Sequence, residues 1–538
     1  MEMDPSPFQR LPDELLEAIV FYLPPDATLA FGGTCKRSNK IACEHLVWRR
    51  HCMQTWRYWQ PEHELRELLL QPPAQTKWRH LYNERRRTDK LAMDIFDELL
   101  KTQQKRIERM EKISGMGYDV KDLLLSVRDG TRDDAEDVLA RRYWADSILA
   151  QLHRNTAVEK WNRLHNKQMV RLEEVLGSYD LFVLAGRRGD LNDIDAEFDR
   201  IARRIRDRDP EFEDLTIRQK AVQIARWLRS EELVGNPDEN NYHALRNNFI
   251  SIALFDEVHT SLPLQSVTIY CAVARRLGVN AKPSNYPHHV HAVIEAPTDI
   301  TLDGKPRSTT QSDEPETMHM DPWRSADEVP RDQLTLRLSQ MGAPTALHGN
   351  HLGATSTLEI ALRTGRNIMN SVQEARERAV GAMSRQPTFP DIEAAWYAML
   401  WSMLILGDGN GAASLHRRRQ CLPYLAEHFQ THFPEDLQLV ESHILPMFHG
   451  EREHHVLTSL VNTLRVADRN AKAPNPRNRG AQQDVTYKVG QVFQHKRYGY
   501  EAFIVGWDYK CSADDGWIER MRVDQLSGGR EQPFYNVV

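Results

Sequence analysis

One stretch of the chain, residues 233–330, departs from the helical pattern that runs through most of the sequence. Within it, SVTIYCAVARRLGV (266–279) is apolar and closes on a glycine, which is typical of a helix C-terminus. HVHAVIEA (289–296) alternates as a half-buried strand does, and MHMDPW (318–323) indicates the end of another strand. The polar segment 297–316 between them predicts a long surface loop. The pattern therefore predicts an α+β unit inside a largely helical protein.

The flanking sequence predicts helices on both sides of this unit and a separate C-terminal domain. Residues 61–232 and 331–470 are rich in Leu, Arg, Glu and Asp, as solvated helices are. Residues 471–484 (AKAPNPRNRGAQQD) lack apolar residues to bury and indicate a linker. Residues 485–538 are dense in Gly, Val, Tyr and Phe with regular turn signals, which predicts a small all-β barrel. The expected fold is multidomain and predominantly α-helical, with an α+β core and this barrel.

Composition narrows the class of protein. The 538 residues suit three or four domains, and 70 Lys+Arg against 76 Asp+Glu argue against a nucleic-acid coat. Six cysteines without a CxxC pair favour reduced thiols over a disulfide framework or a zinc ribbon. The N-terminus lacks the pattern of a secretory signal, and no apolar run is long enough to cross a membrane. We therefore expect a soluble protein of the cytoplasm, the nucleus or both.

Residues 8–57 are expected to form three helices, the first from about residue 11, the second over 26–39 and the third over about 42–48. The sequence LPDELLEAIVFYLPP followed by TCKR and LVWR, in this order and spacing, resembles an F-box. A unit this small leaves an apolar stripe for a partner to cover. The resemblance implies docking to the Skp adaptor and, through it, to a cullin. The residues expected to carry the adaptor contact are Leu11, Pro12, Leu15, Ile19, Leu23 and Trp48.

Residues from about 240 to 325 resemble a transglutaminase-like domain of the SirB type. The resemblance rests on SLPLQSVTIYCAVARRLGV, on NYPHH (285–289) and on DPW (321–323). It implies a cysteine at the start of the helix, a histidine on one strand and an aspartate on the next. His289 and Asp321 fall where the family has its histidine and aspartate, whereas Pro263 or Leu264 falls at the nucleophile position. This implies a vestigial, non-catalytic site.

Other candidate residues of this region have less demanding interpretations. Cys271 lies two turns further along the apolar helix and is interpreted as a buried structural thiol. Ser266, one turn from the nucleophile position, is a weaker alternative that needs a well-placed base. His288, His289 and His291 suggest a metal site, but no cysteine or paired carboxylate is adjacent at ligand spacing, so packing is favoured. His454-His455 is interpreted in the same way, and no metal or cofactor is expected.

Residues 485–538 resemble the YccV/HspQ-like barrel, whose family description is binding of hemimethylated DNA. The resemblance lies in YKVGQ, HKRYGY, IVGWD and the terminal QPFYNVV. Seven Lys+Arg and seven Asp+Glu make the segment neutral, which gives DNA binding little support. One local patch for nucleic acid or a protein remains, formed by His495, Lys496, Arg497 and Tyr498. The family continues beyond QPFYNVV, so an incomplete barrel with an unpaired edge is expected.

The order of these regions resembles F-box-only proteins that carry transglutaminase-like and YccV-like domains. The resemblance implies a non-catalytic, substrate-recognition subunit of an SCF-type ubiquitin ligase, whose central and C-terminal domains present a substrate protein. Two alternatives remain open from the sequence. One is a DNA-binding regulator that acts through the barrel, and the other is a residual transglutaminase-like or protease-like hydrolase.

Overall fold

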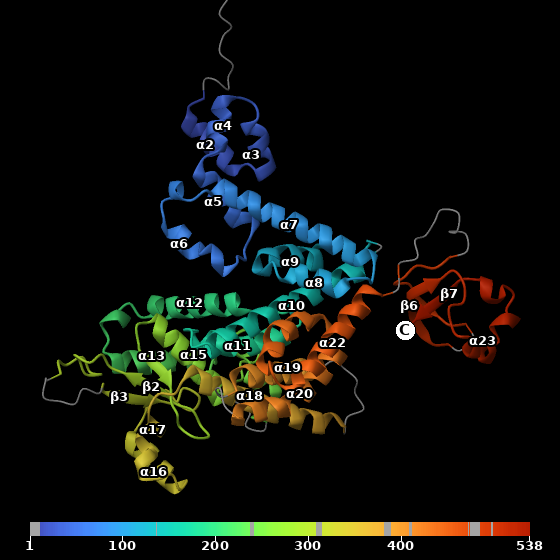
Figure 1. Cartoon of the computed structure of the whole chain (residues 1–538). Coiled ribbons are helices and arrows are strands. Elements are labelled where there is room, and N and C mark those ends of the chain that lie inside the picture. The colour runs from blue at the N-terminus through green and yellow to red at the C-terminus, as the bar shows by residue number, and fades with distance from the viewer. Residues whose placement is uncertain are drawn as a thin grey trace, which may run out of the picture. The chain divides into compact units, whose positions relative to one another are not determined.

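The structure, a computed structural model, describes residues 11–135, 137–236, 241–307, 315–380, 389–407, 412–471, 473, 485–496 and 499–538. It divides into two compact units, Met1–Ile148 with Asn462–Val538, and Leu149–Val461 (Figure 1). The predicted linker 471–484 lies almost wholly outside the described residues. Each unit is described by itself.

The first unit begins with four short helices instead of the three expected. They are α2 (Asp13–Tyr22), α3 (Pro25–Gly32), α4 (Lys36–Ala42) and α5 (His45–Thr55). The expected helix over 26–39 is divided because the chain turns after Gly32, and Cys35 adopts an extended conformation. There its Sγ accepts a hydrogen bond from the backbone N–H of Ser38 and so caps α4. The prediction of one continuous helix here was wrong.

Two apolar clusters hold these helices. Leu16 and Val20 of α2 pack with Ile41 and Val47, which closes the four helices on one another. The second cluster joins α5 to the helices that follow and consists of Trp48, Cys52, Trp56, Trp59, Trp78 and Tyr82. Of the helices that follow, α6 (Leu65–Leu70) and α7 (Trp78–Lys101) contribute to this cluster. Helices α8 (Arg106–Ser114) and α9 (Lys121–Gly130) come next along the chain. The aromatic cluster thus builds the F-box-like helices and α7 into one packed body.

The second unit is mainly helical, as the sequence predicts. Helix α10 (Val138–His165) enters it, and α22 (Arg452–Arg469) leaves it. Between them lie α11 (Leu172–Val183), α12 (Leu191–Arg208), α13 (Ile217–Ser230), α14 (Ile250–Phe255), α15 (Pro263–Arg276), α16 (Arg331–Gln340), α17 (His348–Leu352), α18 (Thr357–Val380), α19 (Ile392–Leu406), α20 (Ala412–His432) and α21 (Leu437–Leu439). None of the described helices is long and apolar enough to span a bilayer.

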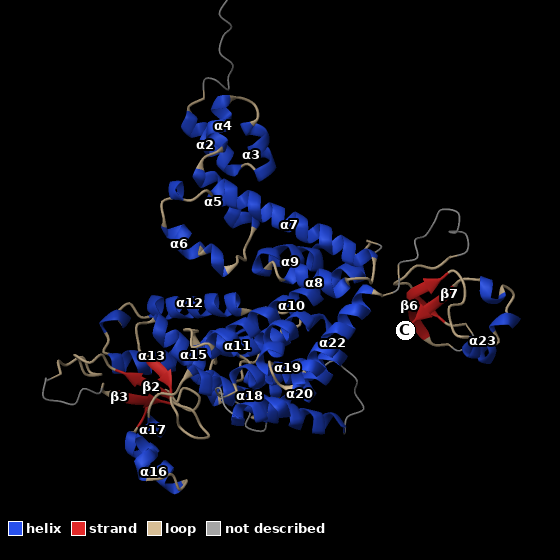
Figure 2. Cartoon of the chain, viewed as in Figure 1, coloured by secondary structure: helices blue, strands red, loops and turns tan. Residues whose placement is uncertain are grey.

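The α+β part of this unit matches the expectation from the sequence. Its four strands, β1 (Ala281–Pro283), β2 (Ala292–Glu295), β3 (Thr317–Met320) and β4 (Glu328–Val329), form one antiparallel sheet in sequential order (Figure 2). Helix α15 contacts β1 and β2 and is buried from Pro263 to Ala274. It ends before Gly278, whose φ of +77° is the left-handed conformation that glycine adopts readily. The apolar helix of the sequence is therefore the core element behind the sheet.

The C-terminal region forms an open sheet. Strands β5 (Val492–Gln494), β6 (Glu501–Asp508) and β7 (Phe534–Val537) pair antiparallel in that order, and helix α23 (Asp515–Met521) lies between β6 and β7 in the sequence. These three strands do not close on themselves within the described residues. The expected barrel is therefore not confirmed.

Candidate functional site

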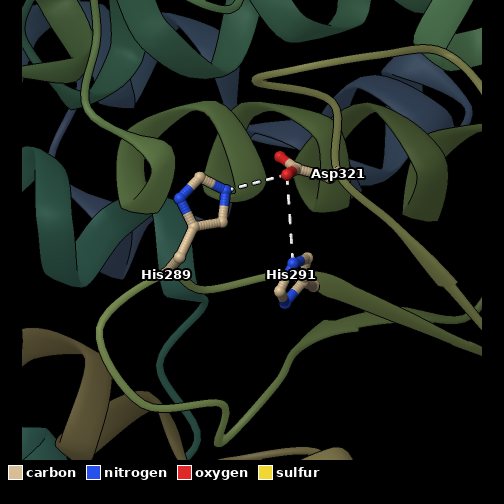
Figure 3. A group of neighbouring side chains, drawn as sticks. All are labelled: His289, His291 and Asp321. Atoms are coloured by element: carbon tan, nitrogen blue, oxygen red, sulfur yellow. Dashed lines mark hydrogen bonds and ion pairs between the residues drawn. The ribbon is translucent and has the colours of Figure 1, made fainter. Parts of the chain in front are cut away.

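The pairing of β2 with β3 brings together residues that lie about thirty positions apart in the sequence. Ala292 is paired with Met320. His291, which precedes β2, and Asp321, which follows β3, therefore lie side by side at the same end of the two strands (Figure 3). His289 reaches the same carboxylate from the loop before β2.

The three side chains differ in their contacts. His289 Nε2 lies 2.8 Å from Asp321 Oδ2 in a hydrogen bond, whereas His291 Nε2 lies 3.9 Å from the same oxygen. Neither ring nitrogen of His291 has a hydrogen-bond partner in the part of the chain that the structure describes, although the residue is only 1% exposed. Burial lowers the pKa of His291 to about 3. Its imidazole is therefore neutral across the physiological pH range.

Asp321 is the charged member of the cluster. Burial disfavours its carboxylate, but the hydrogen bond from His289 and the charges around it outweigh that effect and lower its pKa. The other carboxylate oxygen, Oδ1, accepts a hydrogen bond from the backbone N–H of Arg324. His319, two residues before Asp321 on β3, is also buried, and burial lowers its pKa to about 4. The site therefore holds one carboxylate near the buried, neutral imidazoles of His291 and His319.

The loops that carry the cluster are fixed by hydrogen bonds from the surrounding elements. Trp323 donates from its indole Nε1 to the carbonyl of Ser261, just before α15, over 2.8 Å. Arg229 at the end of α13 donates to the carbonyls of Pro322 and Trp323. These contacts hold the segment after Asp321 against α13 and the start of α15.

The two candidate nucleophiles from the sequence, Cys271 and Ser266, are both buried in the structure. The first turn of α15 is Pro263, Leu264 and Gln265, so it contains no cysteine. Cys271 is buried in the same helix, and burial raises the pKa of its thiol well above the ordinary value. The Ser266 hydroxyl is fully buried between Ser261 Oγ, 2.6 Å away, and the backbone N–H of Gly235, which donates to it. Of the sequence's candidates, the structure therefore brings together His289, His291 and Asp321, without a candidate nucleophile.

A cleft of about 460 Å³ opens beside this cluster. It is lined by the first turn of α15, by Pro287, His288 and Val290, and by polar residues of α18. Arg363 of α18 donates to the carbonyl of Tyr286 and to Asn285 Oδ1, so it also fixes the loop that carries His289. The cleft therefore lies against the loop that carries His289.

On the F-box-like helices, the predicted adaptor residues have different exposures. Leu15 and Ile19 are 52% and 49% exposed and lie one turn apart on α2. Pro12 is exposed, and Leu11 and Leu23 pack partly against the core of Leu16 and Val20. Trp48 is 0% exposed, and its indole Nε1 donates to the carbonyl of Ala42 over 2.7 Å. The expectation of a direct contact by Trp48 is therefore revised, because its side chain is enclosed by the protein itself.

Acidification is expected to destabilise these helices through His51. Its ring lies buried with Nε2 3.1 Å from Thr28 Oγ1, and burial lowers its pKa, so the folded protein keeps it neutral. The unfolded chain takes up a proton below about pH 6.5, so the free energy of unfolding falls as pH drops, by at most about 1.4 kcal/mol per pH unit. The His51→Gln variant should lose this slope. The slope is measured by thermal unfolding of the full chain from pH 7.5 to 5.5, with residues 13–55 followed by hydrogen exchange.

The exposed His80 provides the control for this measurement. The His80→Gln variant removes an imidazole from the same unit and should keep the wild-type slope. Equal slopes in wild type and His51→Gln would contradict the assignment.

The C-terminal patch is described only in part. Arg497 and Tyr498 lie outside the described residues. His495 and Lys496 line an exposed groove of about 700 Å³ together with Tyr487, Val492 and Tyr535. Arg530, one of the basic residues of this region, is paired with Asp515 and Asp524. The described side chains that line the groove are mainly apolar or aromatic, with Lys496 as the one lysine among them.

Comparison with known families places three regions along the chain. Residues 8–54 match the F-box-like family, residues 192–366 the transglutaminase-like superfamily, and residues 485–538 the family "Hemimethylated DNA-binding protein YccV like". These are the three resemblances that the sequence analysis identifies, in the same order.

Curated relatives carry the name F-box only protein 21. The protein of Pongo abelii is 24% identical over 332 residues, which cover 60% of this chain and 47% of that protein. Those of Mus musculus and Homo sapiens are each 23% identical over 331 residues, covering 60% of this chain and 48% of theirs. The chain thus spans about half the length of the curated relatives it matches. No solved structure matches the chain. The chain thus contains an F-box-like, a transglutaminase-like and a YccV-like region, and it is similar over 60% of its length to proteins named F-box only protein 21.

Proposed function

We propose that this protein is a substrate-recognition subunit of a Skp-cullin-F-box ubiquitin ligase. The observation that carries the proposal is the two-sided character of α2. Leu16 and Val20 face the protein's own core, whereas Leu15 and Ile19 are left about half exposed on the other side. Exposed leucine and isoleucine side chains one turn apart provide apolar area for the helices of an adaptor to cover.

The proposal includes no catalysis by this chain. The helix that would carry a transglutaminase nucleophile begins with proline, leucine and glutamine, and the buried thiol of Cys271 is held protonated. Attack on a carbonyl needs an accessible, activated nucleophile. In this proposal, ubiquitin transfer therefore takes place on the partners, in the cytoplasm or the nucleus.

The transglutaminase-like and YccV-like regions would present the substrate protein. The cleft beside α15 and the groove on the C-terminal sheet are concave surfaces of the described chain. The groove is lined by tyrosine, valine and phenylalanine side chains, which suits an apolar peptide better than a phosphate backbone. The neutral balance of residues 485–538 points the same way, so we favour a protein over DNA as the partner of this region.

The experiment that tests the proposal measures binding of the full chain to purified Skp adaptor by calorimetry. The Leu15→Ala/Ile19→Ala variant truncates the two large exposed aliphatic side chains of α2. Each truncated side chain is expected to cost about 1–3 kcal/mol of binding free energy, so the affinity should fall about a hundredfold. Folding should be preserved, because neither side chain belongs to the core.

Leu70 offers the matched control. It is an 87% exposed leucine on α6 in the same unit, and Leu70→Ala should bind the adaptor as wild type does. If wild type fails to bind the adaptor, the proposal falls. If the double variant binds as wild type does, α2 is not the docking surface.

A further inference from the structure

His291 is a buried polar side chain with unusual surroundings. It lies immediately before β2, with both ring nitrogens unpartnered among the described residues. Native proteins rarely bury such a group without a hydrogen bond, because the nitrogen loses its contact with water and gains nothing in return. An unpartnered buried imidazole next to a carboxylate is therefore better explained by a ligand than by packing alone.

The geometry around it suits a small cation. The ligand atoms of His289, His291 and Asp321 all lie within 4.8 Å of one another. Metal–ligand bonds of about 2.0–2.2 Å in a tetrahedral site place neighbouring ligand atoms about 3.3–3.5 Å apart. The observed distances from Asp321 Oδ2, 2.8 Å to His289 Nε2 and 3.9 Å to His291 Nε2, lie on either side of that value. Shifts of about half an ångström would satisfy both.

The backbone holds the three residues in this arrangement. His288 has a φ of +63°, a left-handed conformation that is strained for a residue other than glycine. Such strain is found where the surrounding structure fixes a functional loop. The Trp323 ring contacts His289, and the Tyr286 ring contacts His291, so aromatic side chains flank both imidazoles. The backbone hydrogen bond from Arg324 orients the Asp321 carboxylate, as outer contacts commonly orient metal ligands.

We propose that His289, His291 and Asp321 bind one divalent transition-metal ion, zinc in the first place. Two imidazoles and one carboxylate are a donor set that zinc favours, and three protein ligands leave a fourth position open. The inference does not depend on the ligase proposal, because it concerns only the transglutaminase-like region.

A second three-residue group of the described chain does not offer the same site. Glu393, His428 and His432 also lie close together. Arg376 is paired with the Glu393 carboxylate, and His428 Nε2 lies 3.0 Å from the Glu393 carbonyl in a hydrogen bond. Two of the three side chains of that group, Glu393 and His428, are thus already engaged.

The test uses the full chain, stripped with a chelator and titrated with Co²⁺, which absorbs visible light when bound in a tetrahedral site. We expect one strong equivalent that Zn²⁺ displaces. The His291→Leu variant removes one ligand but fits the buried position, and its affinity for the metal should fall by about a hundredfold or more. Thermal unfolding with and without Zn²⁺ gives a second measurement, because only a metal-binding chain gains stability from the ion.

His288→Asn is the matched control. It removes the neighbouring imidazole, and asparagine tolerates the left-handed backbone. It should bind metal as wild type does. If His291→Leu fails to fold, His289→Gln, at a partly exposed position, applies the same test. Absence of a visible Co²⁺ spectrum in wild type would overturn the proposal, as would a spectrum that survives in the ligand variants.

Discussion

Replacing Arg154 with methionine is expected to lower the free energy of unfolding of the Leu149–Val461 unit by about 3–5 kcal/mol. Arg154 of α10 is 3% exposed and forms a bidentate pair with Asp436, at 2.6 and 2.9 Å. The same guanidinium also binds Glu435 at 2.8 Å. Methionine fills the space but leaves the fully buried Asp436 carboxylate without its counter-charge.

The size of this effect should depend on pH. Burial raises the pKa of Asp436 to about 6 even with Arg154 beside it, and the variant raises that pKa further. A group with a raised folded pKa binds more protons in the folded state than in the unfolded state, so its folded form loses stability as pH rises through the folded pKa. Wild type has completed this loss just above pH 6, whereas the variant continues to lose stability above it. The difference between the two should therefore grow between about pH 6 and pH 8.

Hydrogen-exchange mass spectrometry on α10 and on the segment after α20 measures this prediction. Arg378→Met is the control, because Arg378 forms an exposed i, i+4 pair with Glu374 on α18, and such pairs contribute about 0–1 kcal/mol. An Arg154→Met/Asp436→Leu double variant should regain much of the lost stability, since it removes both charges. A single variant as stable as wild type would show that the pair does not hold the unit together.

The sequence predicted the elements whose pattern is local. The apolar run 266–279 is observed as part of α15, and the alternating segment 289–296 contains β2. Both could be predicted because the order of apolar and polar residues along an element reflects which of its faces are buried. The charged flanks are helical for the same reason. The division of the helix expected over 26–39 was missed because it depends on a turn after two glycines and on a cysteine cap, which are weak local signals.

The candidate site was predictable only in part. His289 and Asp321 were identified through a family resemblance, and the structure places them in hydrogen-bond contact. His291 was interpreted as packing because no carboxylate is near it in sequence. The register of β2 against β3 supplies Asp321 from about thirty residues away, and register cannot be read from a single strand. The available signal for a shared site was the two-residue spacing of His289 and His291, because residues two apart on a strand lie on the same face.

The burial of Trp48 was likewise not predicted from the sequence. It leads to the second prediction with a large expected effect. The Trp48→Ala variant is expected to destabilise the F-box-like helices by about 3–5 kcal/mol, because it opens a cavity in the aromatic cluster. The Trp48 ring contacts Tyr82 at 5.1 Å and His51 at 5.3 Å between ring centroids, and its indole N–H is satisfied by Ala42. All three contacts are lost in the variant.

This variant separates two ways in which a residue can support adaptor binding. Trp48→Ala should weaken binding through unfolding, so residues 13–55 should lose hydrogen-exchange protection and the loss of affinity should shrink on cooling toward the temperature of greatest stability. Leu15→Ala/Ile19→Ala should weaken binding with protection unchanged, because those side chains lie outside the core. Trp48→Phe, which keeps most of the ring volume but loses the indole hydrogen bond, should fall between wild type and alanine. If Trp48→Ala keeps full protection and still loses the adaptor, Trp48 must leave its buried position to contact the partner directly.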